Sequence, residues 1–255
     1  MTDYHTHIGQ YYDSYYDFRD VFKVLKDNGI DENICAYFTP KFDKKEDSIA
    51  FCHAVEEELF EAGKFAGRIG LKTRFLYWAD PLVLEELPLE TIFSKFSYFG
   101  IAMHPFLHNW TTQYSNLVTE IFLFSDKHEL PIFIHTGASA LDQPMQFEKW
   151  FADFPNVQVH LAHCKEAEII IKLFSKYKNI FGDTAFCPTD SYNKICEAGF
   201  KNRMLFGSDF PITHWYEQKG NPNFTQNSLH ESYKQTLQEK YEQTTFSYHM
   251  RPPAK

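Results

Sequence analysis

The 255-residue sequence lacks several features that would place it in a common class of protein. Its five cysteines form no CxxC pair, and their odd number disfavours a disulfide framework. No apolar run reaches the length of a membrane span, and the N-terminal residues lack the basic and then apolar segment of a secretory signal. We therefore expect a cytoplasmic protein with reduced thiols and no membrane partner.

Positive charge is also scarce. Lys and Arg number 25 against 34 Asp and Glu, which gives a formal net charge of -9, and a field of this sign repels phosphate backbones. The one short basic stretch, KFDKK at residues 41–45, is interrupted by an aspartate. We therefore expect no nucleic acid as partner. The sequence is compatible with a homo-oligomer and does not determine the oligomeric state.

Short apolar runs alternate with amphipathic stretches along the chain. The run NICAYFT at residues 33–39 is strand-like, residues 48–64 are helical in pattern, and a further helix is expected at residues 82–96. Eight strand-like runs occur, each but the last followed closely by a helix, with a final helix at residues 229–241. Such alternation predicts an α/β fold with a parallel eight-stranded barrel, a (β/α)8 or TIM barrel, in one domain over residues 1–255.

A glycine-rich loop after the first strand is missing. Such a loop would favour the rival architecture, a doubly wound open sheet, because it binds phosphate at a helix N-terminus. The stretch HTHIGQYYDS, residues 5–14, contains a single glycine. The closed barrel is therefore the expected architecture.

Four of the expected strands carry a histidine or an aspartate at the end where a barrel gathers its active site. His5 and His7 share one face of the first strand, so both imidazoles can meet one ion. His135, His163 and Asp209 end the fifth, sixth and eighth strands. Singly, each residue fits a polar group that ends a strand or begins a turn. Together they predict a metal site.

The segments DYHTH, GIAMHP, IFIHTG, VHLAHC, NIFGDTA and LFGSDFP, in this order, resemble the amidohydrolase superfamily of metal-dependent TIM-barrel enzymes. The likeness is greatest to the amidohydrolase 2 branch, which holds aminocarboxymuconate semialdehyde decarboxylase. It implies that His5, His7, His135 and Asp209 are metal ligands. His163 matches a histidine that binds a second metal or faces the substrate.

The resemblance also implies the number of ions. Binuclear members carry a carboxylated lysine or a glutamate at the end of the fourth strand, and GIAMHP has neither. We therefore expect one divalent ion, with zinc first because imidazole-rich sites suit it, and with manganese, iron or cobalt as alternatives. His104 ends this strand and either lines the pocket or has a structural role before Pro105.

The expected activity is hydrolysis of a C–O or C–N bond, as in a lactone, ester or amide, in a small metabolite. A metal-activated water would attack the electrophilic carbon, while Asp209 takes its proton and delivers it to the leaving group. His163 would donate a hydrogen bond to the oxyanion. The alternatives are a decarboxylase, or lyase, acting on a small unsaturated or aromatic carboxylate, a metal-dependent nuclease, and a non-catalytic metal-binding barrel.

The substrate pocket is less defined by the sequence. Aromatic and histidine side chains are expected on segments after the first, fourth and eighth strands, namely Tyr11, Tyr12, His108, Trp110, Trp215 and Tyr216. Each of them either lines the substrate pocket or packs in the protein interior. Residues 213–224 are expected to form a loop over the mouth. Lys72 and Arg74 would meet a substrate carboxylate if they face inward. Cys164 and Lys165 are candidates for the substrate wall, and a buried, inert thiol is the alternative for Cys164.

Overall fold

The computed structural model describes residues 1–137, 139–220 and 228–241. The strands are β1 (Thr2–Tyr11), β2 (Ser14–Tyr16), β3 (Glu32–Tyr37), β4 (Lys72–Ala79), β5 (Gly100–Met103), β6 (Ile132–Ile134), β7 (Val159–Leu161), β8 (Ile180–Asp183) and β9 (Met204–Leu205). The α-helices are α1 (Phe18–Asp27), α2 (Lys45–Arg68), α3 (Pro81–Leu84), α4 (Leu89–Lys95), α5 (Ser115–His128), α6 (Glu148–Asp153), α7 (Ala167–Lys176), α8 (Thr189–Ile195), α9 (Ile212–Gly220) and α10 (Leu229–Tyr241). Among these described residues, no helix is both long and apolar enough to cross a membrane.

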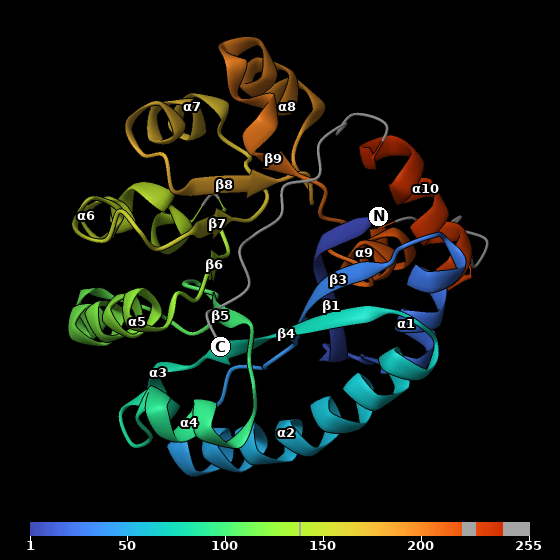
Figure 1. Cartoon of the computed structure of the whole chain (residues 1–255), viewed down its shortest axis with the longest axis horizontal. Coiled ribbons are helices and arrows are strands. Elements are labelled where there is room, and N and C mark those ends of the chain that lie inside the picture. Colours follow the sequence, from blue (N-terminus) through green and yellow to red (C-terminus); the bar gives the residue numbers. More distant parts are fainter. Residues whose placement is uncertain (138, 221–227, 242–255) are drawn as a thin grey trace.

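The strands follow one another in chain order around the sheet, and Figure 1 shows them curling round a centre with the helices outside. Within the described part of the chain, β1 and β3 to β9 pair in parallel, and β2 adds an antiparallel hairpin to β1. The segment that follows β9 returns to β1. The backbone N–H groups of Tyr4 and His7 donate to the carbonyls of Phe206 and Phe210, at 2.9 and 2.8 Å. The predicted α/β barrel fold is therefore confirmed.

Local sequence explains where the first helix begins and ends. The Asp17 side chain accepts a hydrogen bond from the backbone N–H of Arg19 at 2.7 Å, which caps the N-terminus of α1. Phe22 and Leu25 are fully buried on one face of the helix. Gly29 follows in a left-handed conformation with φ of +80°, which ends the helical path and directs the chain into β3.

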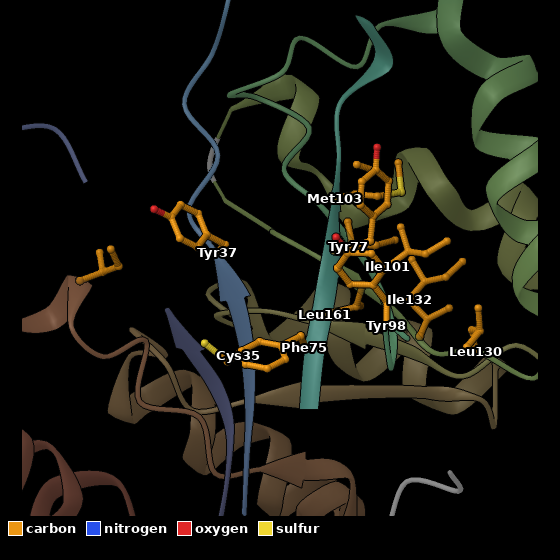
Figure 2. Close-up of a cluster of buried hydrophobic side chains, with 14 of the residues drawn as sticks. Cys35, Tyr37, Phe75, Tyr77, Tyr98, Ile101, Met103, Leu130, Ile132 and Leu161 are labelled. Atoms are coloured by element: carbon orange, nitrogen blue, oxygen red, sulfur yellow. The ribbon is translucent and has the colours of Figure 1, made fainter. Parts of the chain in front are cut away.

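Two layers of apolar side chains fill the structure. The inner layer lies inside the barrel and includes Ile34, Leu76 and Phe133. The outer layer lies between the strands and the helices, and Figure 2 shows part of it, with Cys35, Tyr37, Phe75, Tyr77, Tyr98, Ile101, Met103, Leu130, Ile132 and Leu161 labelled. Neighbouring residues on a strand enter different layers, as Ile34 and Cys35 do, because side chains alternate across a sheet.

Two expected elements differ from the structure. The helix expected at residues 82–96 is divided into α3 and α4, because Pro88 precedes the second helix and cannot donate the hydrogen bond that would continue the first. The expected loop at residues 213–224 is wrong for its described part, since Trp215 and Tyr216 lie in α9. Residues 221–224 of this stretch lie outside the described residues.

Candidate metal centre

A cavity of about 520 Å³ opens at the C-terminal ends of the strands. All five residues for which the sequence predicts a catalytic or metal-binding role line it, namely His5, His7, His135, His163 and Asp209. They come from β1 and from the segments that follow β6, β7 and β9. Closure of the barrel therefore brings together residues that are up to 204 positions apart in the sequence, as His5 and Asp209 are.

Three of these residues place their ligand atoms around one point. The Nε2 atoms of His5 and His7 lie 3.1 Å apart, and Oδ1 of Asp209 lies 3.5 Å from the first and 3.1 Å from the second. Ligands at about 2.0–2.1 Å from a tetrahedral zinc ion would be about 3.3 Å apart. These separations fit one face of a divalent-ion site, and the three residues together could hold such an ion.

His135 lies in the same cavity but outside this three-atom cluster. Its Nδ1 is 3.0 Å from Nε2 of His163, and its ring stacks on that of His104 with centroids 3.7 Å apart. A second group that could hold an ion therefore combines His104 and His135 with Asp142. Because the two rings are within 13° of parallel, their nitrogens do not converge well on one point. Coordination by His135 together with His5 and His7 stays a prediction.

Hydrogen bonds orient three of the imidazole rings in the same manner. In each ring Nδ1 faces an oxygen acceptor, which leaves the lone pair of a neutral ring on Nε2. The acceptors are Oδ2 of Asp183 for His5 at 2.8 Å, the carbonyl of Ala36 for His7 at 3.2 Å, and the carbonyl of Ala185 for His163 at 3.0 Å. This arrangement is typical of metal-binding histidines.

The orientation of His163 bears on its expected role. A neutral ring that donates Nδ1–H to Ala185 presents an acceptor at Nε2, so a hydrogen bond donated to an oxyanion would require the protonated ring. Its position also departs from simple strand alternation. Val159 and Leu161 belong to the outer layer, and His163 turns inward because its backbone adopts φ of +71°. The oxyanion role of His163 stays a prediction.

The cavity floor combines carboxylates with imidazoles. Burial lowers the pKa of His5, but the carboxylates of Asp209 and Asp183 more than offset this and raise it to about 9. Burial raises the pKa of Asp209, yet the nearby rings of His5 and His7 hold it well below its usual value. Burial lowers the pKa of His163 to about 4, so this ring is neutral near pH 7. The anionic carboxylates favour positive charge at this position, either a proton on His5 or a divalent cation that displaces it.

The walls of the cavity are largely apolar and aromatic. Of the aromatic residues expected there, Tyr11, Tyr12 and Tyr216 line it. Trp215 instead stacks on Tyr12 and donates from Nε1 to Asp13 at 3.0 Å.

His108 and Trp110 are buried and do not line the cavity. His108 lies 3.5 Å from Asp80, and its Nε2 is 3.2 Å from the carbonyl of Thr39. The expected pocket role is therefore wrong for these two residues.

Charged residues in the wall differ from those expected. Lys72 and Arg74 begin β4 at the opposite end of the barrel and pair with Glu32, so the expectation that they meet a substrate is wrong. Among the described residues that line the cavity, Lys165 is the only lysine or arginine. Cys164 is fully buried, and burial raises the pKa of its thiol well above the usual value, as expected for an inert thiol.

Sequence reasoning missed one residue at the centre. Asp183, at the end of β8, falls within the segment NIFGDTA but carries no role in the pattern of strand ends. It is fully buried and contacts the rings of both His5 and His160 at 2.8 Å. The sequence does contain a signal for Asp183, namely an aspartate at the end of an apolar strand. A carboxylate buried at such a position needs several hydrogen-bond partners, which indicates a role in the site.

Several solved structures share this architecture. They include a probable 2-pyrone-4,6-dicarboxylic acid hydrolase from Acinetobacter baumannii, with 14% identity and a TM-score of 0.53 over 95% of this chain and 94% of that chain. A dihydroxybenzoic acid decarboxylase from Polaromonas sp. JS666, with bound manganese, has 13% identity and a TM-score of 0.59 over 96% and 99%. A 4-oxalomesaconate hydratase from Rhodopseudomonas palustris has 13% identity and a TM-score of 0.55 over 88% and 80%. These likenesses concern the fold.

The sequence comparison is more specific. No curated protein matches the chain. The family model for amidohydrolases matches residues 98–226, just over half of the chain, and includes the segments that carry His135, His163 and Asp209. The chain therefore belongs to the amidohydrolase family and is an enzyme.

Proposed function

We propose that the protein is a metal-dependent hydrolase that cleaves a C–O or C–N bond, in a lactone, ester or amide, of a small metabolite. The observation that carries this proposal is the position of Asp209. Its carboxylate lies against Nε2 of both His5 and His7 and also borders the cavity. One group can therefore take part in holding an ion and reach a reacting water or leaving group.

His5, His7 and Asp209 have different roles in the proposed reaction. His5, His7 and Asp209 would hold a divalent ion, which would supply the Lewis acidity that polarises a carbonyl group and makes water a stronger acid. Asp209 accepts the proton of the attacking water on its carboxylate and returns it to the leaving group. Apolar and aromatic side chains such as Trp78 and Phe133 surround these residues in the cavity. Zinc is the proposed ion, and manganese is the alternative because a similar barrel binds it.

A second candidate is decarboxylation of a small unsaturated or aromatic carboxylate. The specific observation in its favour is the composition of the cavity wall, where aromatic side chains such as Trp78 and Phe186 accompany the ammonium group of Lys165. The planar ring of such a substrate would pack against the aromatic side chains, and the substrate carboxylate would pair with the ammonium group of Lys165. In that reaction the C–C bond breaks, carbon dioxide leaves, and a proton replaces it on carbon.

Two readouts on one substrate panel test the proposal. Protein loaded with zinc or manganese is supplied with lactones, esters, amides, and carboxylated dienes and aromatics. Hydrolysis is followed by acid production from lactones and esters and by amine release from amides, and carbon dioxide release is followed in parallel. Hydrolysis without carbon dioxide is the expected result. Release of carbon dioxide in equal amount to substrate consumed favours the decarboxylase instead. Stoichiometric metal with no turnover on any member of the panel contradicts both.

A further inference from the structure

Asp183 is a buried carboxylate that accepts four hydrogen bonds beside the candidate metal centre. Its Oδ2 accepts hydrogen bonds from Nδ1 of His5 and from Nε2 of His160, both at 2.8 Å. Its Oδ1 accepts from the backbone N–H groups of His163 and Ala185, at 2.9 and 3.1 Å. A carboxylate has about four lone-pair sites, so these four donors occupy its acceptor capacity.

Because its acceptor sites are occupied, Asp183 differs from the proposed metal ligands. His5, His163 and Asp183 also form a group close enough to hold an ion. An ion bound there would have to displace at least one of the four hydrogen bonds in a fully buried site. Asp209 is different, because it contacts the Nε2 atoms that face the cavity. Asp183 is therefore placed to hold ligands rather than to act as one.

Two of the hydrogen bonds of Asp183 orient residues of the candidate metal centre. The bond to Nδ1 of His5 sets the rotation of this ring, so that Nε2 faces His7 and Asp209. The bond to the backbone N–H of His163 supports the left-handed conformation that turns this residue into the cavity. Asp183 thus links one side chain on β1 with one backbone turn after β7.

His160 completes the arrangement from inside the barrel. Its ring is fully buried, packs on Phe133 with centroids 4.4 Å apart, and donates from Nε2 to Asp183. The Nδ1 atom of His160 has no hydrogen-bond partner among the described residues. A buried polar nitrogen without a partner lowers the stability of the protein. The ring of His160 nevertheless keeps the orientation in which its Nε2 donates to Asp183.

We propose that Asp183 is a positioning residue that sets the metal affinity of the centre by fixing the ring of His5 and the backbone of His163. The inference rests on the proposed metal-dependent function. Partners of this kind orient the ligands of metal sites and raise their basicity, and their loss typically weakens metal binding by about 10- to 100-fold. The effect should therefore appear in metal binding itself, before any turnover is measured.

The test compares two buried aspartates that each contact an imidazole. Asp183→Asn replaces one acceptor oxygen with a donor amide that cannot satisfy the same N–H groups. Asp80→Asn is the matched control, because Asp80 is also buried and lies 3.5 Å from Nδ1 of His108, but His108 does not line the cavity. Zinc affinity of each full-length protein is measured by competition with a chromophoric chelator. We expect zinc affinity to fall about 10- to 100-fold in Asp183→Asn and to change little in Asp80→Asn.

The possible outcomes separate the two proposals. Wild-type zinc affinity in a folded Asp183→Asn variant overturns the positioning role and leaves the metal-dependent function intact. Failure of the wild-type protein to bind zinc or manganese overturns the proposed function instead. Equal losses of affinity in both variants also contradict the specific role, since they would reflect general destabilisation.

A second measurement needs no variant. In zinc-loaded, ¹⁵N-labelled wild-type protein, the ring of His5 should bind zinc through Nε2 and keep a slowly exchanging proton on Nδ1. Zinc bound to Nδ1 of His5, or a rapidly exchanging proton at that atom, would overturn the proposal. This readout therefore decides the question even if Asp183→Asn fails to fold.

Discussion

The Nε2 atoms of His5 and His7 lie 3.1 Å apart and face the same carboxylate oxygen of Asp209. The carboxylates of Asp209 and Asp183 raise the pKa of His5 to about 9, so without a metal this ring carries a second proton near pH 7. A divalent ion would take the place of this proton and carry more charge. The structural relationship between the two histidines therefore links metal binding, protonation and activity.

Metal binding should release a proton. The pKa of His5 is raised to about 9, so below that pH the ion must displace a proton to reach Nε2. Zinc affinity should therefore rise with pH up to about 9 and level off above it. Isothermal titration at pH 7 in buffers of different ionisation enthalpy should give close to one proton released per ion from this group. A binding enthalpy that is the same in every buffer would contradict the linkage.

Asp209→Asn should leave the barrel folded but remove turnover. An amide keeps the shape of the side chain, yet it cannot accept the proton of the attacking water, and loss of a general base typically costs about 10²–10⁴ in rate. The melting temperature is measured beside the rate of substrate conversion. A folded variant that turns over as fast as the wild type would rule out the proposed role of Asp209.

Gly207→Ala should displace His5 and Asp183 and so disturb the candidate metal centre. A Cβ atom there would lie 2.8 Å from Cβ of His5 and 3.0 Å from Cβ of Asp183, which is too close for both. Overpacking of this kind costs about 1–3 kcal/mol of unfolding free energy, and we expect weaker zinc binding as well. Gly67→Ala is the matched control, because nothing lies within 4 Å of its added methyl group at the end of α2. Denaturant titration and zinc competition of both variants check the prediction, and equal behaviour of the two would contradict it.

The contact of Asp80 with His108 should contribute stability that depends on pH. Burial raises the pKa of Asp80, but His108, the Ser48 hydroxyl and the backbone N–H of Leu82 outweigh it and lower the pKa below its usual value. A lowered folded-state pKa stabilises the protein at pH values above the unfolded pKa of about 4, and this stability is lost as the pH falls through the folded value.

Asp80→Asn removes this dependence. The variant should be less stable than the wild type at pH 7, by about 1–3 kcal/mol, and the difference should shrink below pH 4. Denaturant titrations of both proteins between pH 3 and pH 7 measure it. A difference that stays constant across this range would show that the carboxylate charge is not its source.

The strand order and most residues of the centre could be predicted because the relevant signals are local. Apolar periodicity marks each strand and helix, and the end of a barrel strand is where an active site forms. His135 follows Phe133 on the inner face of its strand, as simple alternation expects. His163 also reaches the cavity, but through a left-handed turn that alternation does not contain. Its place in the cavity therefore depends on a backbone conformation that strand alternation does not predict, and its role stays a prediction.

Other features needed contacts between distant parts of the chain. Arg74 is equally compatible with either end of a barrel when only the sequence is considered, and its pairing with Glu32 places it away from the cavity. Trp215 falls in a stretch rich in polar residues, and its helix packs with the aromatic hairpin of β1 and β2. Local propensity predicts neither the position of Arg74 nor the helix that contains Trp215, because both depend on contacts with residues distant in the sequence.

The sequence by itself determined the alternation of strands and helices, the net negative charge, and the histidines and aspartate at the strand ends. These follow from residue type and spacing, which act over a few positions. Only the tertiary structure decided that the cluster comprises His5, His7 and Asp209 with His135 beside it, and that Asp183 holds His5 across 178 positions of sequence. The physical reason is that such contacts arise only when the last strand closes against the first and brings their ends within hydrogen-bond distance.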